Sequence, residues 1–225
     1  MVPKPEPADN GILRLLASLG LVAGLGFLFA KIGGEVIEGE TRSIDAAILL
    51  AFRAAGHPDQ PIGPHWLPGV VMNISSLGSG PVLGLLVTIA VGYLVIKRDR
   101  TKALLLVVAA ASGGVVVAML KNLFGRPRPN LVDHLVRVQT MSFPSGHAAN
   151  SALVFLTIGA LISDVEISRG ARIYIMAVAM TLAILIGLSR LYLGIHWPTD
   201  VAAGWALGAG WATLWRVIST QIRKR

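Results

Sequence analysis

Long apolar runs separated by short polar segments dominate this chain. Helices that cross a bilayer need roughly 20 residues, and six of the runs approach or reach that length. We predict spanning helices at Ile12–Ala30, Pro81–Ile96, Ala103–Leu120, Pro144–Ser163, the stretch from Arg172 to Leu188, and Val201–Val217. The predicted fold class is therefore all-α, a six-transmembrane-helix bundle in a single membrane-embedded domain over residues 1–225. Residues 1–11 are predicted to be a polar lead.

The segment from Lys31 to Gly80 contains no run that could cross a bilayer. Within it, Ile44–Ala55 is apolar except for Asp45 and Arg53, and it ends at a Gly-His-Pro stop signal. We interpret this stretch as a short helix in the membrane interface, with a second one at Trp66–Leu77. The pattern assigns no role to this region.

Composition supports a membrane protein. The chain is 54% hydrophobic and 14% charged, with a mean hydropathy of +0.67, which is far from the composition of a soluble domain. No cysteine is present, so disulfides and thiolate metal sites are excluded. The net charge of +8 does not indicate nucleic acid, because the basic residues are scattered between apolar runs.

The basic residues predict the topology. The turn from Lys97 to Lys102 is strongly basic and should be cytoplasmic. The resulting layout places 12 of the 20 lysines and arginines inside: Lys4, Arg14, Lys97, Arg98, Arg100, Lys102, Arg169, Arg172, Arg216, Arg223, Lys224 and Arg225. We therefore expect a multi-pass protein of the cell (inner) membrane with both termini in the cytoplasm. The loop before Pro144 and the turn before Val201 then face the outer, periplasmic or extracellular, side.

Three polar stretches at that outer end carry candidate chemistry. In His196-Trp197-Pro198-Thr199-Asp200, Pro198 is typical of a first helical residue, which leaves Asp200 within reach of His196. This arrangement predicts a histidine oriented by a carboxylate. An acidic residue in a first turn also complements the helix dipole, so the stretch alone leaves both interpretations open.

The second stretch, Phe143-Pro144-Ser145-Gly146-His147, runs into an apolar segment. A helix that begins at Pro144 would leave the backbone N–H groups of Ser145 and Gly146 free for an anion, with His147 able to donate a proton. The third stretch, from Lys121 to Pro129, offers Lys121 and Arg128 to phosphoryl oxygens. Taken singly, the second is also a plain helix start and the third a basic flank of a membrane helix.

Together the three stretches resemble the signature of the type 2 phosphatidic acid phosphatase superfamily. Six residues separate Lys121 from Arg128-Pro129, and Pro144-Ser145-Gly146-His147 follows. Five residues then separate Ser189-Arg190 from His196, and three separate His196 from Asp200. Residue types, order and spacings all agree with that signature. The motifs span residues 121–200, and the apolar segments around them resemble the membrane branch of the family.

Phosphoryl transfer requires in-line attack and charge stabilisation on the equatorial oxygens. We predict that His196, oriented by Asp200, attacks phosphorus, and that His147 protonates the leaving oxygen. Phosphate would be bound by five groups: the side chains of Lys121, Arg128 and Arg190 and the amides of Ser145 and Gly146. The resemblance implies the same roles. It also implies independence from metal ions and cofactors, and two histidines and one carboxylate among three cations are a poor site for a divalent cation.

The sequence leaves three classes of function to compare. The first is a phosphatase acting on a membrane lipid phosphate or diphosphate; the second passes the phosphate to a lipid or sugar alcohol; the third is a non-catalytic binder or transporter. We favour the first, since a binder needs neither the two histidines nor Asp200. Candidate substrates by resemblance are polyprenyl diphosphate, phosphatidic acid, phosphatidylglycerol phosphate and lipid A phosphates. The expected partners are the lipid substrate and the bilayer, with no nucleic acid and no obligatory protein partner.

Overall fold

The computed structural model describes residues 10–165 and 168–222, and within these ranges its regular secondary structure is helical apart from one small hairpin. The elements are α1 (Asn10–Glu38), α2 (Arg42–Leu50), β1 (Arg53–Ala54), β2 (His57–Pro61), α3 (Leu67–Ser76), α4 (Gly80–Ile96), α5 (Arg100–Phe124), α6 (Gly146–Val165), α7 (Arg169–Tyr192) and α8 (Pro198–Ile222). The predicted lead falls largely in residues 1–9, outside the described residues, as do Lys4 and the basic residues 223–225.

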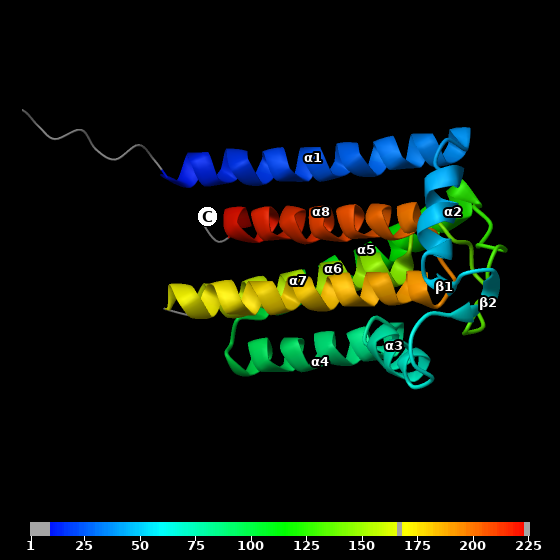
Figure 1. The fold of residues 1–225 in the computed structure, drawn as a ribbon. Helices are drawn as coiled ribbons and strands as arrows, with labels where there is room; N and C mark the ends of the chain where they lie inside the picture. Colours follow the sequence, from blue (N-terminus) through cyan, green and yellow to red (C-terminus); the bar gives the residue numbers. More distant parts are fainter. Residues whose placement is uncertain (1–9, 166–167, 223–225) are drawn as a thin grey trace, which may run out of the picture.

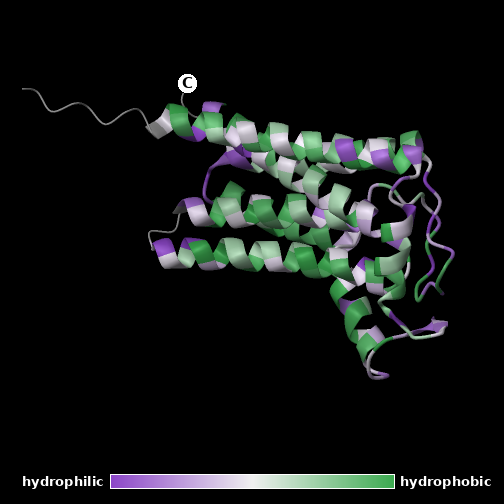
Figure 2. Ribbon diagram, turned by 45° about the horizontal axis from the view of Figure 1, so that its top comes forward, coloured by the Kyte–Doolittle hydropathy of each residue, from purple (hydrophilic) through white to green (hydrophobic). Residues whose placement is uncertain are grey.

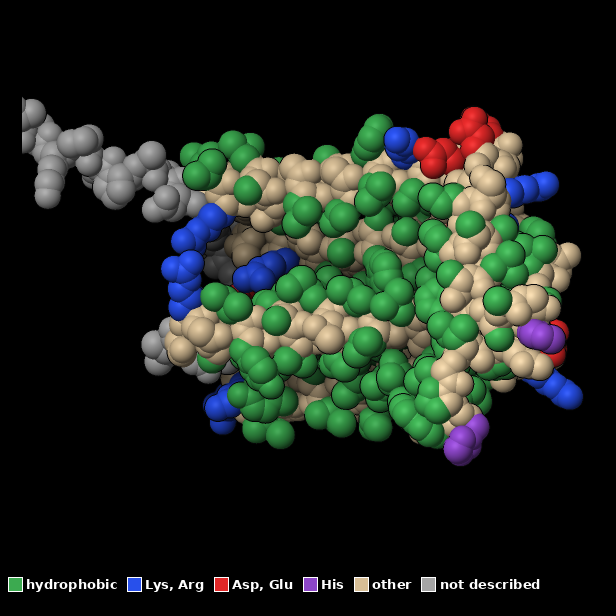
Figure 3. Space-filling model, in the orientation of Figure 1, with side chains coloured by type: hydrophobic (Ala, Val, Ile, Leu, Met, Phe, Trp, Pro, Cys, Tyr) green, Lys and Arg blue, Asp and Glu red, His purple; other side chains and the backbone are tan. Residues whose placement is uncertain are grey.

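The long helices lie side by side as a bundle, with α2, the hairpin and α3 grouped at one end (Figure 1). We call this the hairpin end, and the opposite end, where α4 turns into α5, the far end. Green, hydrophobic residues dominate the long helices (Figure 2), and hydrophobic side chains run along their flanks while many charged side chains lie at the two ends (Figure 3). This distribution fits a bundle that lies across a bilayer.

Length and hydropathy select four helices of the described chain as candidate membrane spans, and these are α1, α5, α6 and α7. The α3–α4 pair, bent by 46°, makes a fifth if it is counted as one broken span. The prediction of six spans is therefore not confirmed as a count. Helix α8 is not among the selected spans, and it packs between α1 and α6, so much of its surface meets protein rather than lipid and does not have to be strongly apolar.

The predicted interfacial helix over Ile44–Ala55 is wrong in its second half. The helix α2 ends at Leu50, and the chain continues as a two-stranded antiparallel hairpin. The Arg53 guanidinium donates to three carbonyls, those of Phe52, Asp133 and Tyr192, at 3.0–3.1 Å. Gly56 adopts a positive φ of 77° in the turn. The contacts of Arg53 with the distant residues Asp133 and Tyr192 draw the chain out of the helical conformation that its local pattern favours.

Close packing of α8 on α6 fixes the frame of the hairpin end. A Cβ at Gly204 would lie 2.7 Å from the carbonyl oxygen of Ser145, and one at Gly208 would overlap the carbonyl oxygen of Ala149. Only glycine allows the two backbones to come this close. This approach holds the start of α8 against the start of α6.

Three phenylalanines support the loop between α5 and α6. The Phe124 and Phe143 ring centroids are 4.5 Å apart, and Phe29 of α1 lies 5.8 Å from Phe143, which is fully buried. Helix α5 ends at Phe124, and Gly125, four residues beyond Lys121, follows it in a left-handed conformation (φ 56°). The loop that follows is thus anchored at both of its ends.

Candidate active site

His196 lies between α7 and α8 with only 2% of its side chain exposed. Its Nδ1 is 3.3 Å from Oδ2 of Asp200, which is fully buried. Helix α8 begins at Pro198 as predicted, so Asp200 sits in the first turn, four residues after the histidine. A buried carboxylate at Nδ1 holds the proton on that nitrogen and leaves Nε2 with its lone pair.

The second ring nitrogen of His196 faces a cation. Its Nε2 is 3.3 Å from Nη1 of Arg128, which also donates to the carbonyl oxygen of Ile195 at 2.5 Å. Burial lowers the pKa of His196 to about 3, and the hydrogen bond to Asp200 opposes only part of this effect. The imidazole is therefore neutral at physiological pH, which is the form that can act as a nucleophile.

Two further cations come from α5 and α7. Lys121 Nζ donates to the carbonyl oxygen of Met141 at 2.5 Å, and Lys121 interacts electrostatically with Arg128 and Arg190. Arg190 Nη1 donates to Oγ of Ser75 in α3 at 2.6 Å, whereas its buried Nε has no hydrogen-bond partner in the described part of the chain. The three predicted cations thus gather in one cluster with donors that an anion could use.

His147 stands at the start of α6 and interacts electrostatically with the same cations and with His196. It lines a cavity of about 260 Å³. The other lining residues come from α3, the loop before α6 and the end of α7: Met72, Ser75, Ser76, Val136, Arg137, Val138, Arg190 and Leu193. The structure brings the predicted acid and a predicted phosphate ligand to one opening.

The role predicted for the Ser145 amide does not fit the structure. Helix α6 begins at Gly146 rather than at Pro144, and the Ser145 N–H donates to the backbone oxygen of Asp200 at 2.9 Å. That N–H is therefore unavailable to phosphate and ties the second motif to the third. Gly146 remains a candidate, since a Cβ there would lie 3.6 Å from Cε of Lys121.

Gly194 forms the turn that presents His196. Its φ is +75°, and a Cβ at this position would lie 2.6 Å from Nη2 of Arg53 and 2.7 Å from the carbonyl oxygen of Asp133. Both the conformation and the lack of space require glycine. The hairpin residue Arg53 therefore supports the loop that carries the histidine.

Sequence reasoning missed several polar residues that surround the motifs. Ser142 donates through Oγ to Oδ2 of Asp200, and Arg126 binds its Oδ1 at 2.6 Å. Asp45 in α2 binds Arg126 from the other side at 2.7 Å. The available signal was the presence of Asp45 and Arg53 in an otherwise apolar stretch, since ionisable residues in such a setting usually have a specific partner.

Comparison with known proteins agrees with this geometry. The model of the PAP2 superfamily, the type 2 phosphatidic acid phosphatases, matches residues 102–224, more than half of the chain. The chain belongs to the PAP2 superfamily. The resemblance inferred from the three motifs is thereby confirmed, and the chain is a phosphoester hydrolase of this kind and a multi-pass membrane protein.

Individual PAP2 relatives cover most of the chain. Phosphatidylglycerophosphatase B of Bacillus subtilis is 31% identical over 183 residues, which are 81% of this chain and 87% of that protein. The crystal structure of a transmembrane PAP2-type phosphatidylglycerolphosphate phosphatase from the same organism matches with a TM-score of 0.74 at 27% identity, over 91% and 96% of the two chains. Aquifex aeolicus LpxE matches with a TM-score of 0.54 at 31% identity, over 71% and 88%.

Proposed function

We propose that this PAP2 protein hydrolyses a membrane lipid phosphate or diphosphate through a phosphohistidine on His196. The observation that carries the proposal is the placement of His196, with Asp200 at Nδ1 and the guanidinium of Arg128 at Nε2. An imidazole held in this way has one nitrogen fixed and the other directed at the anion site. Such an arrangement suits a nucleophile rather than a simple phosphate receptor.

The proposed reaction has two steps. Nε2 of His196 attacks the terminal phosphorus, and the bond from that phosphorus to the leaving oxygen breaks. The leaving oxygen, which belongs to the lipid alcohol in a monophosphate and is the bridging oxygen in a diphosphate, takes a proton from His147. Water then gives its proton to His147 and attacks the phosphohistidine, and the P–N bond breaks to release inorganic phosphate. Lys121, Arg128 and Arg190 stabilise the charge on the equatorial oxygens in both steps, which is the main demand of phosphoryl transfer.

Relatives favour a lipid as the substrate. Besides the B. subtilis phosphatase, an undecaprenyl-diphosphatase of Sulfolobus acidocaldarius is 30% identical over 121 residues, 52% of this chain and 54% of that protein. The names of these two relatives specify different lipids, but both describe the removal of phosphate from a lipid. A phosphotransferase would use the same intermediate, so the measured ratio of free phosphate to phosphorylated acceptor separates the two functions.

We also propose that the hairpin end faces the outside of the cell, with the substrate in the outer leaflet. The basic turn at the far end favours this orientation. A cysteine replacing the exposed Asp59 in β2 should react with an impermeant thiol reagent in intact cells, and one replacing Thr101 at the far end should not. The opposite labelling pattern would reverse the orientation.

The decisive experiment traps the phosphoenzyme. Purified protein in detergent, given lipid monophosphates and diphosphates labelled in the terminal phosphate, should form an acid-labile labelled protein and release phosphate. His196→Ala should do neither. Excess chelator should leave the rate unchanged, because protein side chains supply the positive charge. Full turnover by His196→Ala would refute the assignment of the nucleophile.

A further inference from the structure

Asp200 is held on both of its oxygens, and the two sets of contacts differ. Oδ2 accepts from His196, Ser142 and the backbone N–H of Trp197, so it faces the reaction centre. Oδ1 faces away and forms an ion pair with Nη1 of Arg126 at 2.6 Å. Arg126 stands two residues before Arg128, yet its guanidinium points to the carboxylate behind the histidine instead of towards the phosphate site.

Arg126 is itself held by a residue of the interfacial helix α2. Its Nη2 lies 2.7 Å from Oδ2 of Asp45, and the side chain of Asp45, like that of Asp200, is fully buried, while that of Arg126 is 11% exposed. Thr199 completes the contact: its N–H and hydroxyl donate to Asp45 at 2.9 and 2.7 Å. The Trp197 ring also lies 5.5 Å from the guanidinium carbon. Every oxygen of both carboxylates therefore has a donor.

We propose that Arg126, set in place by Asp45, is a positioning residue for the nucleophile and acts through Asp200. The proposal rests on the proposed function. One guanidinium between two buried carboxylates fixes the plane of Asp200, and this plane decides where the Nδ1–H of His196 points and hence where Nε2 points. Helix α2 thereby gains a role in catalysis without touching the substrate.

Removal of Arg126 has a defined physical consequence. Two buried carboxylates would then face the same space with no cation between them, which is expensive in a low-dielectric interior. Asp200 would relax by rotating or by taking up a proton, and either change weakens its hold on Nδ1 of His196. The cations that bind phosphate remain in place, so attack should suffer while ground-state binding should not.

The test measures the rate of phosphoenzyme formation in a single turnover together with inhibition by inorganic phosphate. Arg126→Gln should slow phosphoenzyme formation about 10- to 100-fold, by analogy with the loss seen when a residue that orients the ligands of a metal site is removed. Inhibition by phosphate should change by less than about 3-fold. Arg126→Lys should recover part of the rate, because its ammonium restores the positive charge between the carboxylates.

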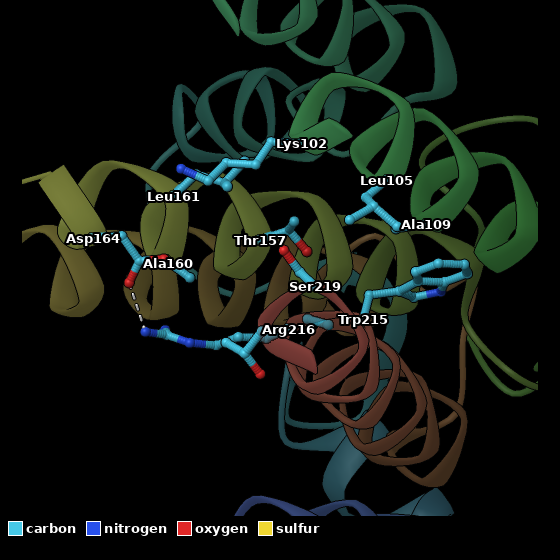
Figure 4. A pocket seen from close by; sticks show the side chains of 12 residues that line it. Lys102, Leu105, Ala109, Thr157, Ala160, Leu161, Asp164, Trp215, Arg216 and Ser219 are labelled. Carbon is cyan, nitrogen blue, oxygen red and sulfur yellow. Dashed lines mark hydrogen bonds and ion pairs between the residues drawn. The ribbon is translucent and has the colours of Figure 1, made fainter. Parts of the chain in front are cut away.

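A double-mutant cycle tests the part assigned to Asp45. Asp45→Asn alone should slow phosphoenzyme formation by less than Arg126→Gln. The double variant should be no slower than Arg126→Gln alone if Asp45 affects the rate through the arginine and not through its hydrogen bonds to Thr199. The matched control is Arg216→Gln, which breaks the 2.9 Å pair with Asp164 at the far end and should leave the rate unchanged (Figure 4).

The possible outcomes are distinct. A wild-type rate for Arg126→Gln would overturn the proposal, and so would equal losses in rate and in phosphate affinity, which would indicate general loss of structure. Multiplied effects in the double variant would refute the link through Asp45. If Arg126→Gln does not fold, the rates of phosphoenzyme formation of Arg126→Lys and Asp45→Asn still test the proposal. Failure of the wild-type protein to form a phosphoenzyme would instead contradict the proposed function.

Discussion

The two ends of the bundle use the same kind of ion pair in opposite ways. At the hairpin end, Arg126 pairs with Asp200, whose side chain is fully buried, whereas at the far end Arg216 and Asp164 are 50% and 39% exposed. An exposed pair contributes little to stability, while a buried pair must offset a large desolvation cost with complete hydrogen bonding. We therefore expect charges that are buried despite this cost to mark the end at which the proposed chemistry takes place.

The surroundings of the two pairs follow the same contrast. Asp200 is contacted by His196, Ser142 and Trp197 in addition to its arginine. Asp164 and Arg216 line a largely apolar cavity between α5, α6 and α8, and their ion pair lies at one side of that cavity (Figure 4). Paired substitutions at the two ends therefore test whether burial separates catalytic charges from structural ones.

The largest difference should come from the two acids. Asp200→Asn keeps the shape of the side chain but removes the charge that holds the Nδ1–H of His196, so kcat should fall on the order of 10³- to 10⁴-fold. Asp164→Asn, the matched change at the far end, should keep kcat within about 2-fold. Steady-state hydrolysis of one lipid phosphate by both variants checks this. Equal effects at the two ends would remove the contrast.

The next effect concerns the proton donor. His147→Ala should slow phosphoenzyme formation by roughly 10²- to 10⁴-fold on a lipid monophosphate, where the leaving oxygen is a strongly basic alkoxide. The loss should be smaller on a diphosphate of the same lipid, because its leaving group is a phosphate that departs with less need of a proton. Rapid-quench measurements on both substrates check the ratio. An equal loss on the two would argue against His147 as the acid.

A smaller effect should appear in stability. The native pKa of His196 is about 3, and that of an unfolded histidine is about 6.5, so the unfolded chain binds more protons between these values. The free energy of unfolding should therefore decrease as pH falls below 6.5, by about 2 kcal/mol at pH 5. His196→Asn should lose less over the same interval. Denaturation in detergent at pH 7.5 and pH 5 measures the free energy of unfolding of the wild-type protein and of His196→Asn. Equal decreases in the two proteins would show that His196 is not the source of the pH dependence.

The smallest effect concerns substrate choice. Arg137 is exposed, lines the cavity beside His147, and has no hydrogen bond or ion pair among the described residues. We expect it to meet a second negative charge on the leaving group. Arg137→Gln should raise KM for a lipid diphosphate about 2- to 5-fold and leave the monophosphate unchanged. The exposed Arg100 at the far end provides the control, since Arg100→Gln should change neither KM.

Much of the site could be predicted because its information is local. Pro198 starts a helix, a spacing of four residues then brings Asp200 to His196, and both outcomes follow from the chain itself. Apolar runs likewise located the long helices, although α1 continues to Glu38 and α5 to Phe124 beyond the predicted ends. Regular hydrogen bonding continues past the first polar residues that interrupt each apolar run, and hydropathy does not record that.

Glycine pairs show where local information ends. Gly20 and Gly24 of α1 have the same spacing as Gly204 and Gly208 of α8, yet a Cβ on either glycine of α1 would meet nothing within 4 Å, whereas α8 packs tightly on α6. Identical spacing permits close approach without selecting the partner. The neighbour is chosen by the whole bundle.

Contacts between distant segments were decided by the tertiary structure alone. Asp45 meets Arg126 across 81 residues of sequence, and the amide of Ser145 is taken by a carbonyl on another helix. The sequence by itself determined the membrane class, the three motifs and the pairing of His196 with Asp200, since residue type and short spacing suffice for these. Only packing decided which buried charge neutralises which, because a charge removed from water takes the partner that the surrounding helices place beside it.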